Sequence, residues 1–400
     1  MDQIDIPSHF LCPISMELMR DPVTVSTGIT YDRESIERWL FSCKNHCCPV
    51  TKQVLCDTEL TPNHTLRRLI QAWCTLNASH GIERIPTPKP PVDKAQIVKL
   101  LNEAKKCPNM QLNCVRRLKS IAFESERNKK CLEAAGAEEF LASIIENGSD
   151  DVSVTEAVEV LSNLKISETH LKSLLNKGSE FLESLMQILR IGNHQSRAYT
   201  TILLKSVFEV ADPIQLISLP LEFFKEVVRV LHDQISQQAS KAALKLLVEL
   251  CPWGRNRIKA VEGGAVLVLI ELLIEASDKR VCELLLVVLD QLCGCAEGRA
   301  ELLNHGAGLA IVSKKIFRVS HAASDRAVRI LSSVCRFSAT SRVLQEMLQV
   351  GVVSKLCLVL QVDTGSKTKE RAREILKLHS RVWKSSSCIP VHLISSYPSS

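Results

Sequence analysis

Most of the chain repeats one pattern of apolar positions. From Lys94 onward an apolar residue recurs every three or four positions, the spacing of one face of an α-helix. Six leucines mark a longer period, and successive ones lie 42 or 43 residues apart: Leu118, Leu161, Leu204, Leu247, Leu289 and Leu331. Each is followed three residues later by a second apolar residue. The leucines are therefore expected on the buried faces of amphipathic helices.

A second set of markers keeps the same period. Glycine or proline precedes a new apolar run at Gly136, Gly178, Pro220, Gly264, Gly306 and Gly351. A period near 42 with several helices per unit is typical of armadillo and HEAT repeats. One such unit cannot bury its own apolar face, so neighbours must stack into a superhelix with an extended groove. We expect an all-α solenoid of about six repeats over residues 94–384, in which Leu376 begins a final cap. Residues 385–400 then form a Ser/Pro-rich tail.

The N-terminal part follows a different pattern. Residues 22–25 and Gly28 predict a short hairpin, with glycine in the turn. Asp32 is expected to cap a helix whose apolar face holds Ile36, Trp39 and Leu40. Asn63 is expected to cap a second helix, which carries an apolar stripe up to Trp73. Prolines between residues 79 and 93 predict a semi-rigid linker, which sets residues 1–78 apart as a domain with its core in 9–76.

Composition narrows the class of protein. Hydrophobic residues make up 46% of the 400 residues and aromatic residues only 4%, which favours stacked helices over a β-sandwich. The net charge of +6 is mild, and the basic run between Arg116 and Lys130 lacks interleaved aromatic residues, so we expect a solvated helix face and no nucleic-acid partner. No apolar run is long enough to span a membrane. The sixteen cysteines are scattered through apolar segments, and the residues from Met1 onward do not resemble a signal peptide. Both observations indicate a reducing compartment, the cytoplasm or also the nucleus.

The residues of the N-terminal domain carry a family resemblance. Phe10–Ile14 read FLCPI, residues 21–23 read DPV and residues 27–33 read TGITYDR. The segments WL, CPVT and LTPN then follow at Trp39, Cys48 and Leu60. Taken in this order they resemble the U-box, the zinc-free relative of the RING ubiquitin-ligase domain. The residues that match the structural motif are Cys12, Pro13, Asp21, Pro22, Gly28, Tyr31, Asp32, Cys48, Pro62 and Asn63.

With the helical repeats, the whole chain is similar to a plant U-box ubiquitin ligase with armadillo repeats. The fold class implied is an α+β U-box domain, RING-like and zinc-free, followed by an all-α armadillo superhelix. The activity implied is that of a RING-type ubiquitin transferase that forms no covalent bond to ubiquitin and needs no cofactor. The partners implied are a ubiquitin-conjugating enzyme carrying ubiquitin and protein substrates in the groove, and a homo-oligomer stays open.

No metal site is expected in this domain. The cysteine pairs of a RING domain are reduced to Cys12 with Ser15 and Cys48 with Thr51, and a hydroxyl cannot replace a thiolate at structural zinc. The cluster of Cys43, His46, Cys47 and Cys48 has no second group to complete a tetrahedron. Polar contacts should take the place of the metal, with six candidates, about half of which could be plain surface charges: Glu17, Asp21, Asp32, Arg33, Glu34 and Arg38.

The resemblance also assigns the docking surface for the conjugating enzyme. Ile14 would be its apolar centre, Trp39 its large flat anchor and Pro49 its second-loop contact, although each of the three could also be a plain core residue. Lys52 stands where many U-boxes carry an arginine that binds both the conjugating enzyme and ubiquitin. Lysine keeps the charge but lacks the planar fork of donors.

Two functions stay open from the sequence. The first is a ubiquitin ligase whose repeats select substrates, in plant stress or immune signalling as the resemblance suggests. The second is a non-catalytic armadillo scaffold with a degenerate U-box. Intact Ile14, Trp39 and Pro49 favour the ligase, and Lys52 is the residue that favours the scaffold.

Overall fold

The computed structural model describes residues 6–42, 45–55, 57, 59–78, 92–148, 151–176, 180–384 and 398. The chain divides into two compact units, Met1–Ile166 and Ser167–Ser400, and each is described by itself. The proline-rich segment expected at 79–93 lies almost wholly outside the described residues, and so does the tail expected at 385–400, apart from Pro398.

A small antiparallel sheet forms the centre of the N-terminal domain. Its strands are β1 (Pro22–Thr24), β2 (Thr30–Asp32) and β3 (Thr61–Pro62), in the order β2-β1-β3. Val23 pairs with Tyr31 on one side and Pro62 on the other. Gly28 has a φ of +81° in the turn between β1 and β2, a conformation open to glycine at little cost, so the predicted hairpin is confirmed.

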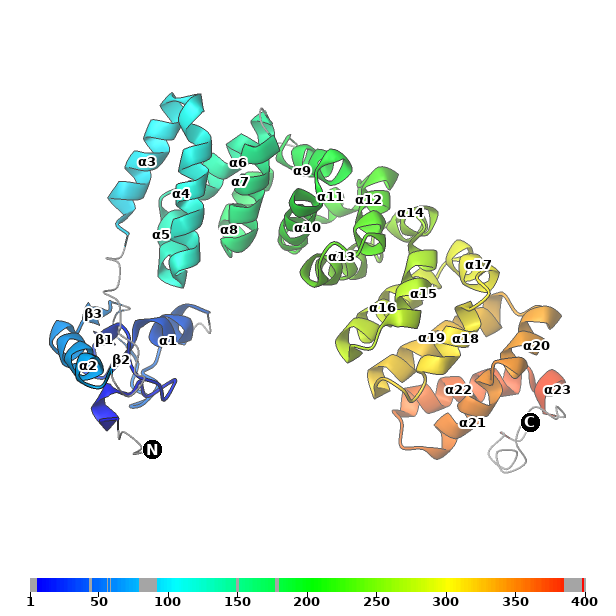
Figure 1. Ribbon diagram of the computed structural model, residues 1–400. Helices are drawn as coiled ribbons and strands as arrows, with labels where there is room; N and C mark the ends of the chain where they lie inside the picture. Colours follow the sequence, from blue (N-terminus) through cyan, green and yellow to red (C-terminus); the bar gives the residue numbers. More distant parts are fainter. Residues whose placement is uncertain are drawn as a thin grey trace. The chain divides into compact units, whose positions relative to one another are not determined.

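Short helices pack on this sheet (Figure 1). The turn η1 (Ser8–Phe10) precedes it, and α1 (Arg33–Glu37) continues directly into the π-helical η2 (Arg38–Ser42). The second predicted helix is α2 (His64–Leu76), and its cap is confirmed because Asn63 Oδ1 accepts a 3.0 Å hydrogen bond from Leu66 N. The core between sheet and helices is buried, and its members are Phe10, Cys12, Met19, Val23, Val25, Tyr31, Ile36, Leu40, Cys48, Leu55, Leu60, Ile70 and Cys74.

The prediction that the Asp32 side chain caps a helix is wrong. Asp32 does precede α1, but its carboxylate makes no cap hydrogen bond. Instead Oδ1 accepts from Arg20 N at 2.8 Å and from Asp21 N at 2.9 Å. The carboxylate turns away because the loop before β1 offers it two backbone donors at once.

Five further helices complete the first unit. They are α3 (Lys94–Lys106), α4 (Gln111–Glu124), α5 (Glu126–Ala134), α6 (Ala137–Asn147) and α7 (Asp151–Asn163), with the turn η4 (Pro108–Met110) before α4. The basic run expected to be a solvated face contributes ion pairs, because Lys119 Nζ lies 2.9 Å from Glu156 Oε2 and 2.8 Å from Glu159 Oε2.

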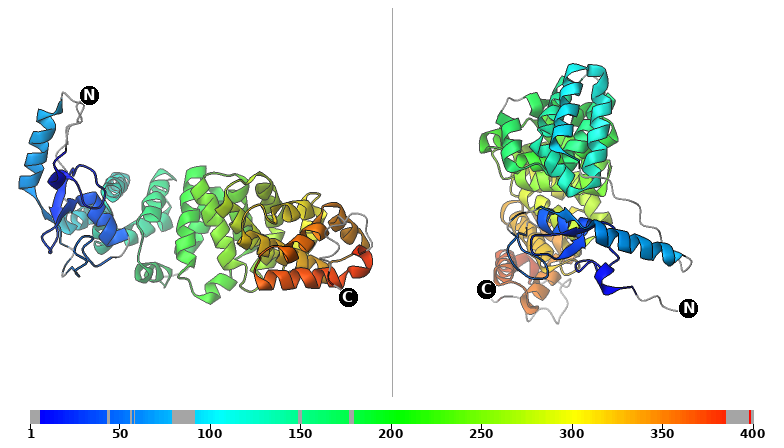
Figure 2. Two further views of the ribbon diagram at one scale, coloured as in Figure 1. Left: turned by 90° about the horizontal axis from the view of Figure 1, so that it is seen from below. Right: turned by 90° about the vertical axis from the view of Figure 1, so that its left-hand side faces the viewer.

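The second unit is a stack of helices in groups of three (Figures 1 and 2). The groups are α8 (Glu168–Asn176), α9 (Glu180–Ile191) and α10 (His194–Phe208); α11 (Pro213–Ile217), α12 (Leu221–His232) and α13 (Gln237–Leu250); α14 (Asn256–Glu262), α15 (Ala265–Glu275) and α16 (Lys279–Leu292); α17 (Ala296–Asn304), α18 (Gly308–Lys315) and α19 (His321–Phe337); α20 (Ser341–Gln349), α21 (Val352–Gln361) and α22 (Ser366–Leu378). The four-residue α23 (Ser380–Trp383) ends the described stack.

The periodic leucines explain this architecture. All six are at most 1% exposed, and each lies on the long helix that closes a group, such as Leu247 on α13. Three of the marker glycines, Gly136, Gly264 and Gly351, have φ between +73° and +84° just before the next helix. Gly178 lies outside the described residues. The expected all-α armadillo architecture is confirmed.

One detail of that prediction is wrong. Leu376 does not begin a final cap but is fully buried near the end of α22, which packs against α19 as α19 packs against α16. Leu376 lies 45 residues after Leu331, so the last repeat is slightly longer than the period of 42 or 43. In the described residues no single helix is long and apolar enough to cross a membrane; α20 and α21, bent by 65° at their junction, pass that test only as a pair.

Candidate functional site

Two loops of the N-terminal domain have the same backbone structure. The first is closed by a bridge between Leu11 and Leu18, the second by a bridge between Cys47 and Val54. In the first, Cys12 N donates to Glu17 O at 2.8 Å and Met16 N donates to Cys12 O at 2.8 Å. The second repeats both bonds, from Cys48 N to Gln53 O at 2.8 Å and from Lys52 N to Cys48 O at 2.9 Å. The Cys-Pro segments found in the sequence are thus two copies of one turn.

Each loop holds one residue in the left-handed region. Met16 has a φ of 57° and Lys52 a φ of 61°, and they occupy the same position in the two copies. This conformation costs an L-residue roughly 1 kcal/mol or more. Neither position is glycine, so each side chain is present at the expense of some stability, and side chains at such positions commonly serve function.

The cysteines of the two loops are structural. Cys12 and Cys48 are both 0% exposed, and Cys12 Sγ accepts a hydrogen bond from Asp32 N at 3.3 Å. Cys48 Sγ lies 3.0 Å from Tyr31 Oη and accepts from Thr51 N at 3.5 Å. Burial by itself raises the pKa of the Cys48 thiol, but hydrogen bonds from Thr27, Thr51 and Tyr31 lower the pKa to about 6. Burial raises the pKa of the Tyr31 hydroxyl above its usual range, with the Cys48 contact adding to the effect.

The described side chains include no group of three His, Cys, Asp or Glu residues arranged to hold a metal ion. Cys43, one member of the cluster considered from the sequence, lies outside the described residues. Ser15 Oγ accepts from Glu17 N at 3.4 Å, so this hydroxyl serves the turn. A domain without zinc stays a prediction.

Three of the six polar candidates, Asp21, Asp32 and Arg33, join the segment just before β1 to the end of β2 and the start of α1. Arg33 Nε lies 2.5 Å from Asp21 Oδ2, and both side chains are only about 15% exposed. Asp32 adds the two backbone contacts already described. The other three lie at the surface: Arg38 and Glu34 form an exposed pair at 2.7 Å, and Glu17 is exposed. A partly buried ion pair of this kind contributes more than an exposed one.

The apolar residues assigned to docking lie on or beside the two loops. Ile14 and Trp39 are half-buried and pack against the domain core, and Pro49 is half-buried in the second loop. Trp39 Nε1 donates to Cys47 O at 2.8 Å, which fixes the indole against the second loop. Trp39 therefore contributes to the core while staying partly exposed, and its part in a docking surface stays a prediction.

Lys52 is placed beside Trp39. Its Nζ lies 5.9 Å from the centroid of the indole ring, within the range of a cation–π contact. The structure therefore brings Trp39, Cys47 and Lys52 together directly, whereas Ile14 is related to them through the shared core.

Sequence reasoning missed three residues of this surface. Met16 is 71% exposed, Val50 is 51% exposed and Val54 is 77% exposed. All three lie in the two loops, and exposed large apolar side chains gathered in this way usually mark an interaction surface. The repetition of Cys-Pro-Ile-Ser-Met as Cys-Pro-Val-Thr-Lys could have indicated Met16 and Val50.

The remaining motif residues have structural places. Pro22 begins β1, Gly28 makes the hairpin turn and Tyr31 is fully buried in β2. Pro62 lies exposed in β3, and Pro13 is exposed in the first loop.

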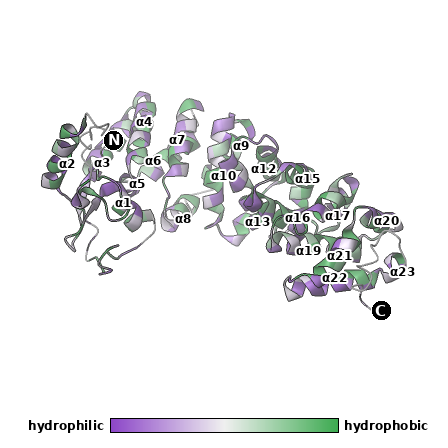
Figure 3. Ribbon diagram, turned by 60° about the horizontal axis from the view of Figure 1, so that its bottom comes forward, coloured by the Kyte–Doolittle hydropathy of each residue, from purple (hydrophilic) through white to green (hydrophobic). Residues whose placement is uncertain are grey.

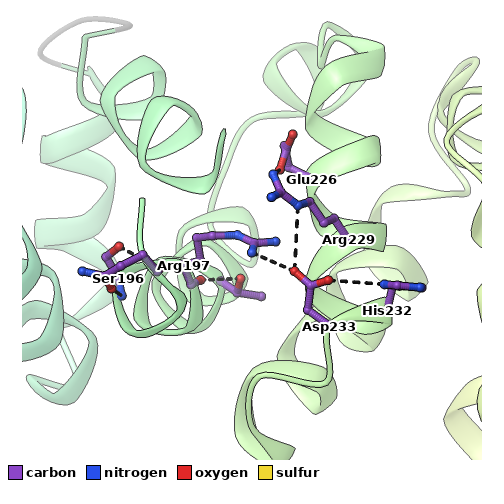
Figure 4. Close-up of polar contacts among 8 residues, drawn as sticks. Ser196, Arg197, Glu226, Arg229, His232 and Asp233 are labelled. Atoms are coloured by element: carbon purple, nitrogen blue, oxygen red, sulfur yellow. Dashed lines mark hydrogen bonds and ion pairs between the residues drawn. The ribbon is translucent and has the colours of Figure 1, made fainter. Parts of the chain in front are cut away.

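The solenoid contains a separate polar cluster that joins two repeats (Figure 4). The Arg197 side chain is 2% exposed, and its Nη1 donates to Asp233 Oδ2 at 2.8 Å. Arg229 and His232 approach the same carboxylate at 3.8 and 3.3 Å. Burial raises the pKa of Asp233, but hydrogen bonds from Arg197 and His232 outweigh it and hold the pKa below its usual value. The cluster connects α10 to the end of α12 and has the character of a structural link.

Comparisons with known proteins agree with this geometry. The family model for the U-box domain matches residues 6–79, and the model for the plant U-box protein ARM repeat region matches residues 96–399. The chain is 59% identical to the E3 ubiquitin-protein ligase PUB23 of Arabidopsis thaliana, over 99% of this chain and 98% of that protein. It is 56% identical to the E3 ubiquitin-protein ligase PUB22 of the same plant, over all of both.

Solved structures show the same fold at low identity. One, titled "A conserved phosphorylation switch controls the interaction between cadherin and beta-catenin in vitro and in vivo", has a TM-score of 0.63 at 16% identity and covers 86% of this chain and 62% of that one. The match supports the armadillo fold alone. The two family models and the full-length relatives show that the chain belongs to the plant U-box family with an armadillo-repeat region and is a ubiquitin-protein ligase.

Proposed function

We propose that the N-terminal domain docks a ubiquitin-conjugating enzyme through its two loops and Trp39. The observation that carries this proposal is the exposure of three large apolar side chains, Met16, Val50 and Val54, in the two loops, one of which also holds half-buried Ile14 while the other contacts Trp39. A docking enzyme would cover these side chains, and a large aromatic ring with an ordered frame is a typical interface anchor.

The chemistry belongs to the thioester of the conjugating enzyme. Cys12 and Cys48 are fully buried, so neither thiol can reach a ubiquitin carbonyl without unfolding of its loop. We therefore infer that the domain accelerates transfer by holding the loaded enzyme in a reactive geometry, which can lower a barrier without a new covalent bond. Lys52, whose Nζ lies 5.9 Å from the centroid of the Trp39 ring, would be the cation that contacts ubiquitin.

The repeats would then select protein substrates. The long helices α10, α13, α16, α19 and α22 of the second unit pack one against the next, a surface suited to an extended segment of another protein. We further propose a role in plant stress or immune signalling, which rests on the family resemblance, and a location in the cytoplasm or nucleus. Free thiols at all described cysteines, from Cys12 to Cys357, support a reducing compartment.

The test is autoubiquitination by the purified full chain with a panel of conjugating enzymes. At least one enzyme should support transfer, and Ile14→Ala and Trp39→Ala should abolish it while Val152→Ala, an exposed apolar position on α7, should not. Absence of transfer with every enzyme, from a protein that melts cooperatively, would favour the alternative of a non-catalytic scaffold.

A further inference from the structure

The closing helices of the repeats in the second unit form a continuous row. Helix α10 packs against α13, α13 against α16, α16 against α19 and α19 against α22. Figure 3 shows these five helices following one another along the unit. A long partner lying across the row would meet the same face of each helix in turn.

Positive charge is concentrated in this row. The five helices carry fourteen Lys and Arg residues against six Asp and Glu residues. The other helices of the unit, α8, α9, α11, α12, α14, α15, α17, α18, α20, α21 and α23, carry twelve against eleven. The net charge of the whole chain is mild, but the excess of positive charge in the second unit lies mostly on these five helices.

Three carboxylates within the row are already neutralised by its own arginines. Asp290 on α16 accepts a hydrogen bond from Arg326 at 2.9 Å and forms an ion pair with Arg329 at 2.8 Å, and both arginines lie on α19. One carboxylate thus meets two guanidinium groups, and it is far less exposed than they are, at 8% against 34% and 42%. Each of the two uses a single nitrogen on Asp290, so donors remain for a second carboxylate.

The other two neutralised carboxylates lie farther along the row. Asp325 pairs with Arg371 at 2.9 Å, and Glu374 pairs with Arg336 at 2.5 Å. Ion pairs between neighbouring helices therefore neutralise half of the six carboxylates of the row. Most of its lysines and arginines remain exposed or half-exposed.

Side chains at equivalent positions of successive helices in the row follow a pattern. The residues two positions before the periodic leucines of α10, α13, α16 and α19 are Ile202, Lys245, Val287 and Arg329. Lys245 and Arg329 are exposed, and Ile202 and Val287 are half-exposed. Apolar and cationic side chains thus alternate from one helix to the next at the same register.

This alternation determines how far apart the apolar and acidic residues of a bound segment must lie. Packed helices lie roughly 8–10 Å apart, and an extended chain advances about 3.3 Å per residue. About three residues of an extended segment therefore span one helix of the row. A segment that satisfies all four positions carries an apolar residue, then an acidic residue three positions later, and repeats that unit.

We propose that this row binds an extended acidic protein segment with the spacing apolar-x-x-acidic-x-x-apolar-x-x-acidic, in either chain direction. The inference rests on the proposed function, in which the repeats select protein substrates, and it names the class of segment selected. A nucleic acid fits less well, because Ile202 and Val287 interrupt the cations and the Glu283 carboxylate would repel a continuous line of phosphates.

Fluorescence polarisation with the full chain tests the proposal. The probes are a labelled twelve-residue peptide with Leu and Glu in this spacing and Ser or Gly elsewhere, its reversed sequence, and an isomer in which each Glu is moved next to a Leu. One of the two spaced peptides should bind at least about fivefold tighter than the isomer, with an affinity that falls as salt rises.

Paired variants locate the site. Lys245→Gln combined with Arg329→Gln should weaken binding of the spaced peptide by about fivefold or more, because both cations face the acidic positions. The matched control is Lys225→Gln with Arg342→Gln, two exposed cations on α12 and α20 outside the row, which should leave binding unchanged.

Three results would overturn the proposal: equal binding of the isomer, equal loss in the control pair, or tighter binding of a twelve-nucleotide single strand than of either spaced peptide. Autoubiquitination with the best conjugating enzyme is measured in parallel. If it persists while the peptides fail, the inferred substrate class is wrong and the ligase function stands. If it is absent while the peptides bind, the docking proposal fails and this inference stands.

Discussion

The two loops of the N-terminal domain have the same backbone structure, called their frame below, and differ in the side chains that they expose. Cys-Pro-Ile-Ser-Met from Cys12 and Cys-Pro-Val-Thr-Lys from Cys48 fold with the same two backbone hydrogen bonds and the same buried thiol. The left-handed position holds an exposed methionine in the first loop and a lysine over Trp39 in the second. The frame therefore does not require a particular side chain at that position, which is free to carry function.

The tips of the loops differ as well. Ile14 is half-buried against the core, whereas Val50 at the equivalent position is 51% exposed. The tip of the first loop is thus an apolar side chain held against the core, whereas the second loop combines an exposed apolar side chain with the Lys52 cation. The comparison suggests that the first loop serves mainly affinity and the second mainly activation of the thioester.

The largest expected effect is that of Ile14→Ala. Truncation of an ordered apolar residue at the centre of an interface commonly costs ~2 kcal/mol, on the order of thirtyfold in affinity for the conjugating enzyme. Val50→Ala, the matched change in the second loop, should cost less because the side chain is held less firmly. Isothermal titration with an unloaded conjugating enzyme compares them, and thermal melts control for folding. An Ile14→Ala protein that melts like the wild type and binds equally well would show that the docking surface is misassigned.

A second effect separates the loops by stability. Tyr31→Phe removes the hydroxyl that contacts Cys48 Sγ at 3.0 Å and accepts from Val50 N at 3.3 Å, both in the second loop. The loss should be at least about 1 kcal/mol of unfolding free energy, since a hydrogen bond with a buried neutral partner contributes about that much and one with an ionised thiol contributes more. Hydrogen exchange should accelerate for amides 48–53 and stay unchanged for amides 12–17. Equal acceleration in both loops would mean that Tyr31 supports the whole domain rather than one loop.

The third effect concerns Lys52, where the chain departs from the common arginine. Lys52→Arg should raise the discharge of ubiquitin from a loaded conjugating enzyme several-fold, or about 1 kcal/mol, because a planar guanidinium can donate to two proteins in a fixed geometry. Lys52→Ala should lower it, and docking affinity should change little in both. Single-turnover discharge onto free lysine measures the effect. Equal rates for the three side chains would exclude Lys52 from activation and weaken the contrast between the loops.

The sequence predicted the repeats better than it predicted the loops. A period of 42 or 43 residues carried by fully buried leucines such as Leu247 leaves little freedom, because a shift would expose an apolar stripe. Asp32 shows the opposite case. Its place before α1 was correct, but two backbone donors from the preceding loop compete for the carboxylate, and such tertiary competition is invisible in local sequence.

The proposed docking surface is only partly predictable from the sequence for a similar reason. Ile14 and Trp39 are assigned to it because they match a family motif, while Met16, Val50 and Val54 are apolar residues whose exposure depends on the loop conformation. The left-handed backbone of Met16 and Lys52 could not be expected either, since neither residue type favours it.

The smallest expected effect tests whether the left-handed backbone position costs the same free energy in the two loops. Met16→Gly and Lys52→Gly both replace an L-residue at positive φ by the residue that adopts this conformation freely. Relief of roughly 1 kcal/mol in the folded state is partly offset by the greater entropy of glycine in the unfolded chain, so each should stabilise the domain by about 0.5 kcal/mol. Urea unfolding of the two variants should give gains of the same sign and similar size, since the flanking hydrogen bonds are the same. At saturating conjugating enzyme, Met16→Gly should discharge ubiquitin at the wild-type rate, whereas Lys52→Gly should fall to the rate of Lys52→Ala. Gains of opposite sign would show that the loops share hydrogen bonds but not energetics, and equal discharge rates would show that the lysine has no function beyond the frame.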